Sequence, residues 1–167
     1  MKMAGFYDES MSNGIGWRAV LFVSGCPHNC LGCHNKVAQD FNYGEEFDEN
    51  KIIERMKENS ILKGVTISGG EPLCPENISE VNHFIERVRK ELPKFNVWCY
   101  TGYTFEELKN REDEITNITL NNIDVLVDGR FIEARKNPEI KFRGSDNQRI
   151  IDLKKTLKEN KIVELEV

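Results

Sequence analysis

Three cysteines within eight residues restrict what this chain can fold into more than any other feature of its sequence. Cys26, Cys30 and Cys33 are separated by three and then two residues, and glycine and proline residues stand among them. This composition favours a loop that wraps around a single object. The chain has five cysteines, an odd number, whereas a secreted disulfide scaffold is usually shorter and spreads paired cysteines along its length. The tight cluster therefore predicts a metal site in a reducing compartment.

The cysteine loop by itself leaves three interpretations open. A [4Fe–4S] cluster usually takes four cysteine thiolates, so three local ligands would leave one iron free to bind a small molecule. A structural zinc site needs four closed ligands, and His28 or His34 could supply the fourth. A redox pair of Cys30 and Cys33 is the third interpretation, but the additional Cys26 fits it poorly. The residues favour iron–sulfur, with zinc as the main alternative.

The length and composition predict a single cytoplasmic domain covering residues 1–167. The chain is 39% apolar and 31% charged, which argues against disorder, and its net charge is −5. A mildly acidic chain is a poor candidate for binding nucleic acid, which favours a basic surface. The sequence contains no run of about 18 apolar residues that could span a membrane. Its first residues, 1–10, lack the basic and then apolar pattern of a signal peptide.

Short apolar runs alternate with amphipathic stretches along the chain. The runs predict strands at residues 17–23, 65–68, 96–100 and 123–127, and the stretches predict helices at residues 49–59, 78–92 and 104–114. Pro93 ends the second helix, and Thr104 with Glu107 forms a capping box for the third. Strand–helix–strand alternation predicts an α/β fold with a mostly parallel sheet.

Unusual residues follow each predicted strand, at the ends where ligands bind in parallel sheets. The cysteine loop follows the first strand, and Gly69, Gly70 and Glu71 follow the second. The two glycines let a ligand approach the main chain closely, and carbonyl oxygens there could accept hydrogen bonds from an ammonium group. Residues 101–103 and 128–131 follow the other two strands. A Gly-Gly-Glu sequence alone could equally be a simple turn, so its weight comes from the nearby cysteines.

Five stretches of the chain together resemble the radical S-adenosylmethionine superfamily, whose signature is a C-x3-C-x2-C loop and a GGE-type loop after the next strand. They are LFVSGCPHNCLGCHNK (21–36), ISGGEPL (67–73), YTGYTFEEL (100–108), VLVDGRF (125–131) and FRGSDNQRIID (142–152). The similarity is closest to the activating proteins of anaerobic (class III) ribonucleoside-triphosphate reductases. The DGRF and RGSxNQR stretches narrow the choice, because the cysteine and glycine motifs are shared across the superfamily.

The resemblance implies an oxidoreductase built as a partial (β/α) barrel of mostly parallel strands. A [4Fe–4S] cluster would be held by Cys26, Cys30 and Cys33, and S-adenosylmethionine would bind its open iron. Reductive cleavage would yield a 5′-deoxyadenosyl radical, which removes a hydrogen atom from a glycine of the reductase. No catalytic residue is implied beyond the cluster ligands. The residues implied to contact S-adenosylmethionine are Gly32, Cys33, His34, Gly69, Gly70 and Glu71.

The resemblance also implies partners: the anaerobic reductase as protein substrate, and reduced flavodoxin or a similar low-potential electron donor. Gly32 is shared with the reductase activators, but they often carry tyrosine where this chain has His34. The Cys33-His34-Asn35 sequence is also found in pyruvate formate-lyase activating enzymes, so another glycyl radical enzyme remains an alternative target. Those activators are noticeably longer than this chain.

Several other residues have both a functional and a structural interpretation. Cys74 is expected to be a free thiol, Cys99 to pack in the core, and His83 to lie on a helix surface. Asp128 could contact the cofactor or cap its turn, and these two interpretations are equally weighted. The sequence leaves open the roles of Tyr100, Tyr103, Arg143, Asn147 and Arg149.

Overall fold

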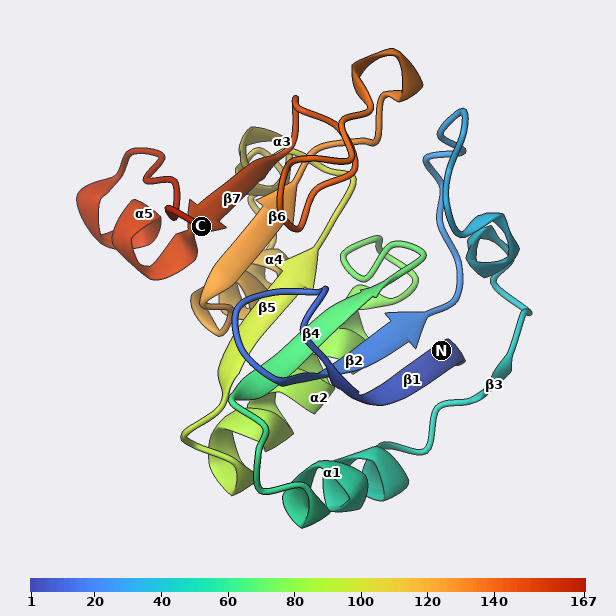
Figure 1. Ribbon diagram of the computed structural model, residues 1–167. Helices are drawn as coiled ribbons and strands as arrows, with labels where there is room; N and C mark the ends of the chain where they lie inside the picture. The colour runs from blue at the N-terminus through green and yellow to red at the C-terminus, as the bar shows by residue number, and fades with distance from the viewer.

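The apolar runs that follow residue 17 form the centre of a seven-stranded sheet in the computed structural model, which describes all 167 residues (Figure 1). The strand order is β3-β1-β2-β4-β5-β6-β7. The strands are β1 (Lys2–Ser10), β2 (Arg18–Val23), β3 (Glu45–Glu46), β4 (Gly64–Gly69), β5 (Asn96–Tyr100), β6 (Val125–Asp128) and β7 (Arg149–Asp152). The four strands predicted from the sequence are β2, β4, β5 and β6, which are neighbours in the sheet.

The sheet is mixed, with a parallel centre and antiparallel edges. β2, β4, β5 and β6 pair in parallel, whereas β1 and β3 on one side and β7 on the other pair antiparallel. The expected α/β fold is therefore confirmed, but the sheet is less uniformly parallel than the sequence predicted. β2 and β4 run side by side from Arg18 opposite Gly64 to Val23 opposite Gly69. This register brings the cysteine loop and the Gly69–Gly70 loop to the same end of the sheet.

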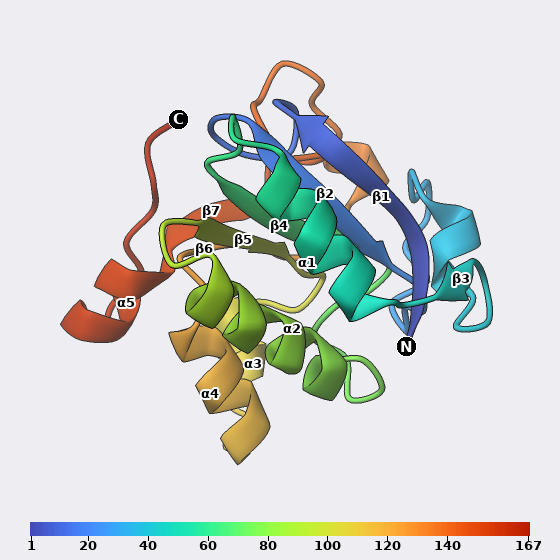
Figure 2. The same cartoon turned by 90° about the horizontal axis from the view of Figure 1, so that it is seen from below.

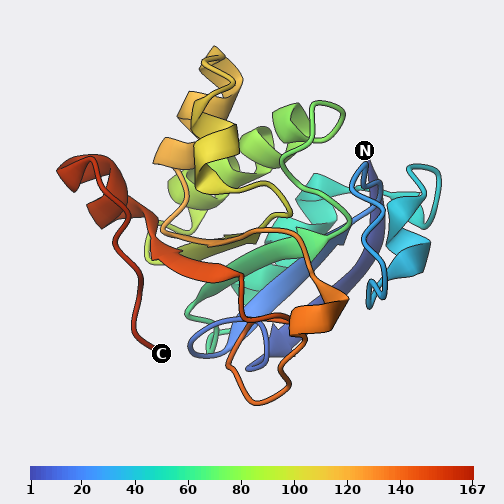
Figure 3. The same cartoon turned by 90° about the horizontal axis from the view of Figure 1, so that it is seen from above.

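Helices α1 to α4 cover one face of the sheet (Figures 2 and 3). The helices are α1 (Glu49–Glu58), α2 (Ile78–Glu91), α3 (Phe105–Lys109), α4 (Glu114–Asn121) and α5 (Leu153–Glu159). Figures 2 and 3 show α1 to α4 on one side, α5 beside the β7 edge, and the loops before β2 and between β6 and β7 on the opposite side. None of the helices has both the length and the apolar character needed to cross a membrane.

Helix α2 packs on the sheet through the apolar residues whose spacing predicted the helix. Ile78, Val81, Ile85 and Val88 are at most 3% exposed, as i, i+3 and i+4 positions on one helical face should be. They belong to a core of 23 buried residues contributed by both the helices and the strands. Burial of this stripe fixes the helix against the parallel strands.

The predicted helix over residues 104–114 is too long, because α3 ends at Lys109 and the separate helix α4 begins only at Glu114. The capping box is present, since the Thr104 side chain accepts from the Glu107 backbone and the Glu107 side chain accepts from the Thr104 backbone. The helix ends at Lys109, however, and Glu112 has a φ of 55°, which cannot continue a right-handed helix. Asp113 then caps α4 by accepting a hydrogen bond from the Thr116 backbone.

A buried arginine links neighbouring strands at the amino ends of the parallel part of the sheet. Arg18 is 1% exposed, and its guanidinium donates hydrogen bonds to Thr66 Oγ1, at 2.8 Å, and to the carbonyl oxygens of Val65 and Asn96, at 2.9 and 2.7 Å. Burial lowers the pKa of Arg18 to about 10, so the side chain stays protonated at neutral pH. One side chain thus links β2, β4 and the start of β5.

We expect Arg18→Ala to lower the free energy of unfolding by about 3 kcal/mol, because it leaves several buried acceptors without a donor. The matched control is Arg55→Ala, which removes an exposed ion pair with Asp8 and should cost less than about 1 kcal/mol. Urea unfolding of both variants under the same anaerobic conditions measures the difference. Equal losses would contradict a special role for Arg18.

Candidate cofactor site

A cavity of about 330 Å³ lies at the carboxyl ends of the parallel strands. Its walls come from the cysteine loop after β2, the glycine loop after β4, and the segments that follow β5 and β6. The predicted site residues that line it are Cys26, Cys30, Cys33, His34, Gly69, Gly70 and Glu71. The structure therefore brings together residues that are far apart in the sequence, at the sheet end where α/β proteins bind ligands.

Main-chain hydrogen bonds hold the start of the cysteine loop. Gly25 and Cys26 donate their backbone N–H groups to the carbonyl oxygens of Ala38 and Gln39, at 2.7 and 3.1 Å. Gly25 and Gly32 have φ values of +98° and +74°, which glycine adopts without strain. These φ values explain the glycines directly before Cys26 and directly before Cys33.

Burial raises the pKa values of two of the loop thiols. The pKa of Cys26 rises to about 11, and that of Cys30 rises as well, chiefly because the thiolate would lose water. Both thiols are therefore protonated at neutral pH in the chain without cofactor. Metal ligation requires thiolates, so filling the site must release protons.

The arrangement of the thiols fits a cluster better than a single ion. The three cysteines are free and partly exposed around the cavity. No group of three or more cysteine, histidine, aspartate or glutamate side chains converges closely enough to hold one metal ion. Thiolates spread around a cavity suit a [4Fe–4S] cube, whose ligands bind separate iron atoms.

The glycine loop lies directly against the cysteine loop. Gly70 donates its backbone N–H to the Val23 carbonyl, and Glu71 donates its N–H to the Gly25 carbonyl, both at 2.7 Å. A Cβ atom on Gly70 would collide with the Gly25 carbonyl oxygen and lie 2.7 Å from that of Ala38. The second glycine is thus required by contact between the two loops. The Gly70 carbonyl oxygen receives no hydrogen bond from within the chain.

The Glu71 side chain connects three segments of the site. It is fully buried, and Oε1 accepts hydrogen bonds from the Leu73 backbone and the Thr101 hydroxyl, at 2.9 and 2.7 Å. Oε2 accepts from the Gly102 backbone at 2.7 Å and lies 2.7 Å from His28 Nε2. All four contacts are made within the chain, and each carboxylate oxygen has two of them.

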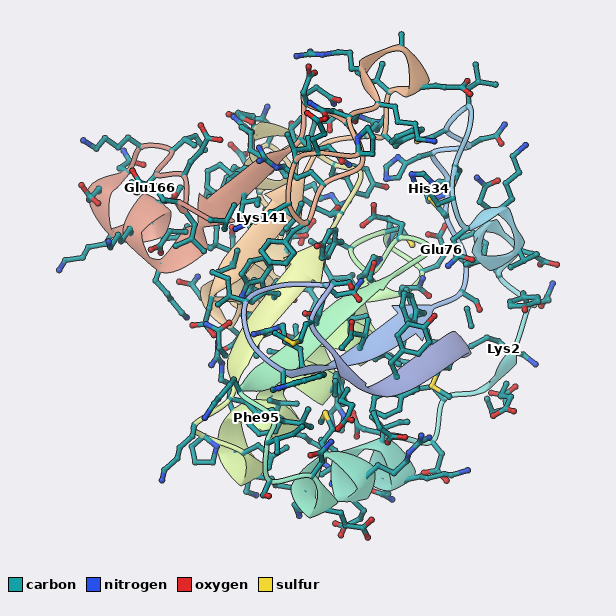
Figure 4. The ribbon with its side chains drawn as sticks, viewed as in Figure 1. Lys2, His34, Glu76, Phe95, Lys141 and Glu166 are labelled. Atoms are coloured by element: carbon teal, nitrogen blue, oxygen red, sulfur yellow. The ribbon has the colours of Figure 1, made fainter.

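The two histidines of the cysteine loop occupy different surroundings. The His28 side chain is only 5% exposed and faces Glu71. His34 is exposed, and its ring lies 4.9 Å from that of Phe131. Figure 4 shows His34 on the cysteine loop, on the side that faces the segment following β6. Gly32, in contrast, lies outside the cavity wall, where a Cβ would approach the Glu133 carboxyl group at 2.9 Å.

The remaining cysteines do not face the cavity. Cys74 is buried behind the glycine loop, where its thiol donates to the Glu71 carbonyl at 3.2 Å, and burial raises its pKa to about 12. Cys99 is buried in the main core. His83 is exposed and pairs with Glu49. These three placements agree with the structural interpretations drawn from the sequence.

Asp128 is a structural residue in this chain. It is 1% exposed, accepts a hydrogen bond from the Phe105 backbone at the start of α3, and pairs with Arg149 at 2.6 Å. Arg149 also binds Glu106, at 2.7 Å. The carboxyl group thus joins β6, α3 and β7, and it does not line the cavity.

Of the other residues whose roles the sequence left undecided, one lines the cavity and the rest lie around it. Tyr100 lines the cavity, whereas Tyr103 packs edge-to-face against His28. Asn147 donates to the Arg130 carbonyl at 2.9 Å, and Arg143 donates to the Lys141 carbonyl at 3.3 Å. Both therefore hold the long loop between β6 and β7.

Sequence reasoning missed several residues of the cavity wall. Thr101 and Gly102 stand next to the considered Tyr100 and Tyr103, and Gln148 lies within the quoted RGSxNQR stretch. The Gln148 side chain donates to the Gly129 carbonyl at 2.9 Å and accepts from Gly144 at 2.8 Å. Asn13 also lines the cavity, but it lies in a loop with no sequence signal.

We expect Gly70→Ala to push the two loops apart, because the new methyl group meets two main-chain carbonyls. Stability should fall by about 1–3 kcal/mol, as for other overpacked sites, and binding of S-adenosylmethionine to the reconstituted protein should fall with it. The control is Gly5→Ala, whose Cβ would lie 3.8 Å from Phe22, an ordinary contact. Thermal unfolding and ligand titration of both variants measure the difference, and similar behaviour would contradict the prediction.

Comparisons with known proteins agree with this site. Residues 12–151 match the family described as "4Fe-4S single cluster domain". The anaerobic ribonucleoside-triphosphate reductase-activating protein of Haemophilus influenzae is 42% identical over 147 residues, covering 86% of this chain and 92% of the relative. The proteins of the same name from Escherichia coli K12 and Enterobacteria phage T4 are each 38% identical and cover 93% and 89% of their own lengths. This chain therefore belongs to the family of anaerobic ribonucleoside-triphosphate reductase-activating proteins, which are radical S-adenosylmethionine enzymes with a [4Fe–4S] cluster.

Proposed function

We propose that this protein activates an anaerobic ribonucleoside-triphosphate reductase by generating a glycyl radical on it. The observation that carries the proposal is the meeting of three free thiols and the Gly69–Gly70 loop around one cavity. Membership of the activating-protein family and the 4Fe-4S domain match agree with that chemistry. When bound, the cluster supplies the electron that cleaves S-adenosylmethionine into methionine and a 5′-deoxyadenosyl radical.

We assign the cluster to Cys26, Cys30 and Cys33. Each thiol faces the cavity, and none is engaged in a disulfide. Cys74 is excluded as a fourth ligand because its thiol lies behind the glycine loop and is bonded to the Glu71 carbonyl. The fourth iron would therefore remain open for the amino and carboxylate groups of S-adenosylmethionine.

We assign the amino group of S-adenosylmethionine to the main chain of the glycine loop. The unoccupied carbonyl oxygen of Gly70 is an acceptor of the kind that an ammonium group needs. Gly69 and Glu71 shape this loop, and the Glu71 carboxylate orients it through its internal hydrogen bonds. The adenosyl part would lie beside the backbone of Gly32, Cys33 and His34.

We treat residues 1–167 as one radical S-adenosylmethionine domain with the curved, open sheet of a partial barrel. β3 and β7 form the two unpaired edges of the sheet. An open cavity lets a glycine-bearing loop of the reductase reach the bound nucleotide, which explains how so small a chain can act on a large protein. Reduced flavodoxin, or a similar low-potential protein, is the proposed electron donor.

The test combines the reconstituted protein, S-adenosylmethionine, reduced flavodoxin and the anaerobic reductase. We expect methionine and 5′-deoxyadenosine to form, together with a glycyl radical signal in the electron paramagnetic resonance spectrum of the reductase. Omitting any component should abolish the glycyl signal. A signal on pyruvate formate-lyase instead would reassign the target, and a colourless protein that binds zinc would overturn the enzyme assignment.

Single alanine substitutions test the cluster ligands. We expect reconstituted wild-type protein to hold about four irons per chain, and each of Cys26→Ala, Cys30→Ala and Cys33→Ala to lose most of this iron. Cys74→Ala is the matched control and should retain it, because its thiol faces away from the cavity. Iron and sulfide analysis with visible absorption measures the result. Loss of iron from Cys74→Ala would contradict the assignment of three ligands.

A further inference from the structure

His28 lies between the first two cysteines and points away from solvent. Its Nε2 atom is 2.7 Å from Glu71 Oε2, and its ring packs edge-to-face on Tyr103, with centroids 4.4 Å apart. The other three hydrogen bonds to the Glu71 carboxylate come from the glycine loop and from the end of β5. His28 is therefore the one side chain through which the cysteine loop reaches this carboxylate.

The hydrogen-bond partners define the direction of this contact. In its Nε2–H tautomer, His28 donates to Glu71 Oε2, and the carboxylate accepts from all four partners. Gly102 N–H and His28 Nε2–H share Oε2, while Leu73 N–H and Thr101 Oγ–H share Oε1. Removal of the histidine donor leaves a fully buried carboxylate oxygen with a single partner, which is costly for a charged group.

The chain is also built to leave room for the imidazole. A Cβ atom on Gly102 would collide with His28 Cδ2 and lie 2.7 Å from Nε2. The first residue after Thr101 must therefore be small for the ring to reach Glu71. The cysteine loop is thus attached to the glycine loop by the main-chain bond from Glu71 to Gly25, by the Asn77 side chain, which donates to the Ser24 and Glu71 carbonyls, and by the His28 side chain.

We propose that His28 is a positioning residue: its hydrogen bond to Glu71 sets the spacing between the cysteine loop and the Gly69–Gly70 loop. This inference rests on the proposed function, in which one loop holds the cluster and the other binds the amino group of S-adenosylmethionine. The spacing between the loops then determines where the nucleotide meets the open iron. His28 also lines the cavity, but the role proposed for it acts through Glu71.

Two substitutions separate the hydrogen bond from the packing of the ring. His28→Phe retains an aromatic ring against Tyr103 but removes the donor, whereas His28→Gln retains an N–H donor of similar reach. His83→Ala is the matched control, because His83 also pairs with a glutamate, at 2.8 Å, but is exposed and remote from the cavity. All variants are prepared as full-length chains.

The first measurement is independent of the cofactor. Hydrogen exchange of the chain before reconstitution reports on the amides of Gly70, Glu71 and Gly102, which are bonded between the loops and to the carboxylate. We expect exchange at residues 69–73 and 101–103 to be about tenfold faster in His28→Phe than in wild type. His28→Gln and His83→Ala should remain close to wild type.

The second measurement is S-adenosylmethionine binding to the reconstituted, reduced protein. We expect the dissociation constant to rise about tenfold in His28→Phe, the scale of a lost hydrogen bond to a charged group. The change in the electron paramagnetic resonance spectrum on adding S-adenosylmethionine should also be smaller. His28→Gln should recover most of both properties, and His83→Ala should match wild type.

The outcomes decide the two proposals separately. The positioning role is wrong if His28→Phe exchanges and binds like wild type, or if His28→Gln behaves like His28→Phe. Failure of His28→Gln to fold also overturns it, because the imidazole would then be needed for packing. A His28→Phe chain that cannot hold the cluster, beside a loaded His28→Gln chain, supports it. If wild-type protein shows no spectral response to S-adenosylmethionine, the proposed function fails, whereas the exchange result still tests the link between the loops.

Discussion

The buried carboxylate of Glu71 is the contact on which the candidate site depends. It is fully removed from solvent, and burial of a charge is tolerated only when its hydrogen bonds are satisfied. The donors come from the glycine loop, the end of β5 and the cysteine loop. Because these segments must be in place together to satisfy one group, they form a single cooperative unit. Hydrogen bonds within the chain therefore contribute to the shape of the site.

The parallel strands carry a buried charge at each end, and the two charges have different consequences. Arg18, on β2, donates to the Thr66 side chain and the Val65 carbonyl of β4 and to the Asn96 carbonyl of β5 at the amino end. Glu71 is held within the loops at the carboxyl end, and a cavity of about 330 Å³ remains in front of those loops. The predicted site residues gather at the carboxyl end, so cofactor and protein substrate are expected to enter from that side.

The thiols and the glycine loop need different chemical properties, although they lie around the same cavity. In the proposed function, thiols with raised pKa values lose protons to bind iron, whereas the neighbouring carbonyl of Gly70 remains free to accept a hydrogen bond. The chain meets both demands by bonding the two loops through other atoms, namely the Glu71 amide and carboxylate. A radical enzyme needs such rigidity, because the position of the cleaved nucleotide decides which hydrogen atom is removed.

The sequence by itself determined the four parallel strands, the first two helices and the family, because these depend on local periodicity and on motifs with fixed spacing. It did not predict β1, β3, β7, α4 or α5, because edge pairing depends on distant contacts, and it extended α3 through the turn at Glu112. Glu71 was expected to contact the cofactor, yet only the tertiary structure brings Thr101, Gly102 and His28 to its carboxylate. Hydrogen bonds between segments 30 to 43 residues apart follow from strand order and register, which no local pattern contains.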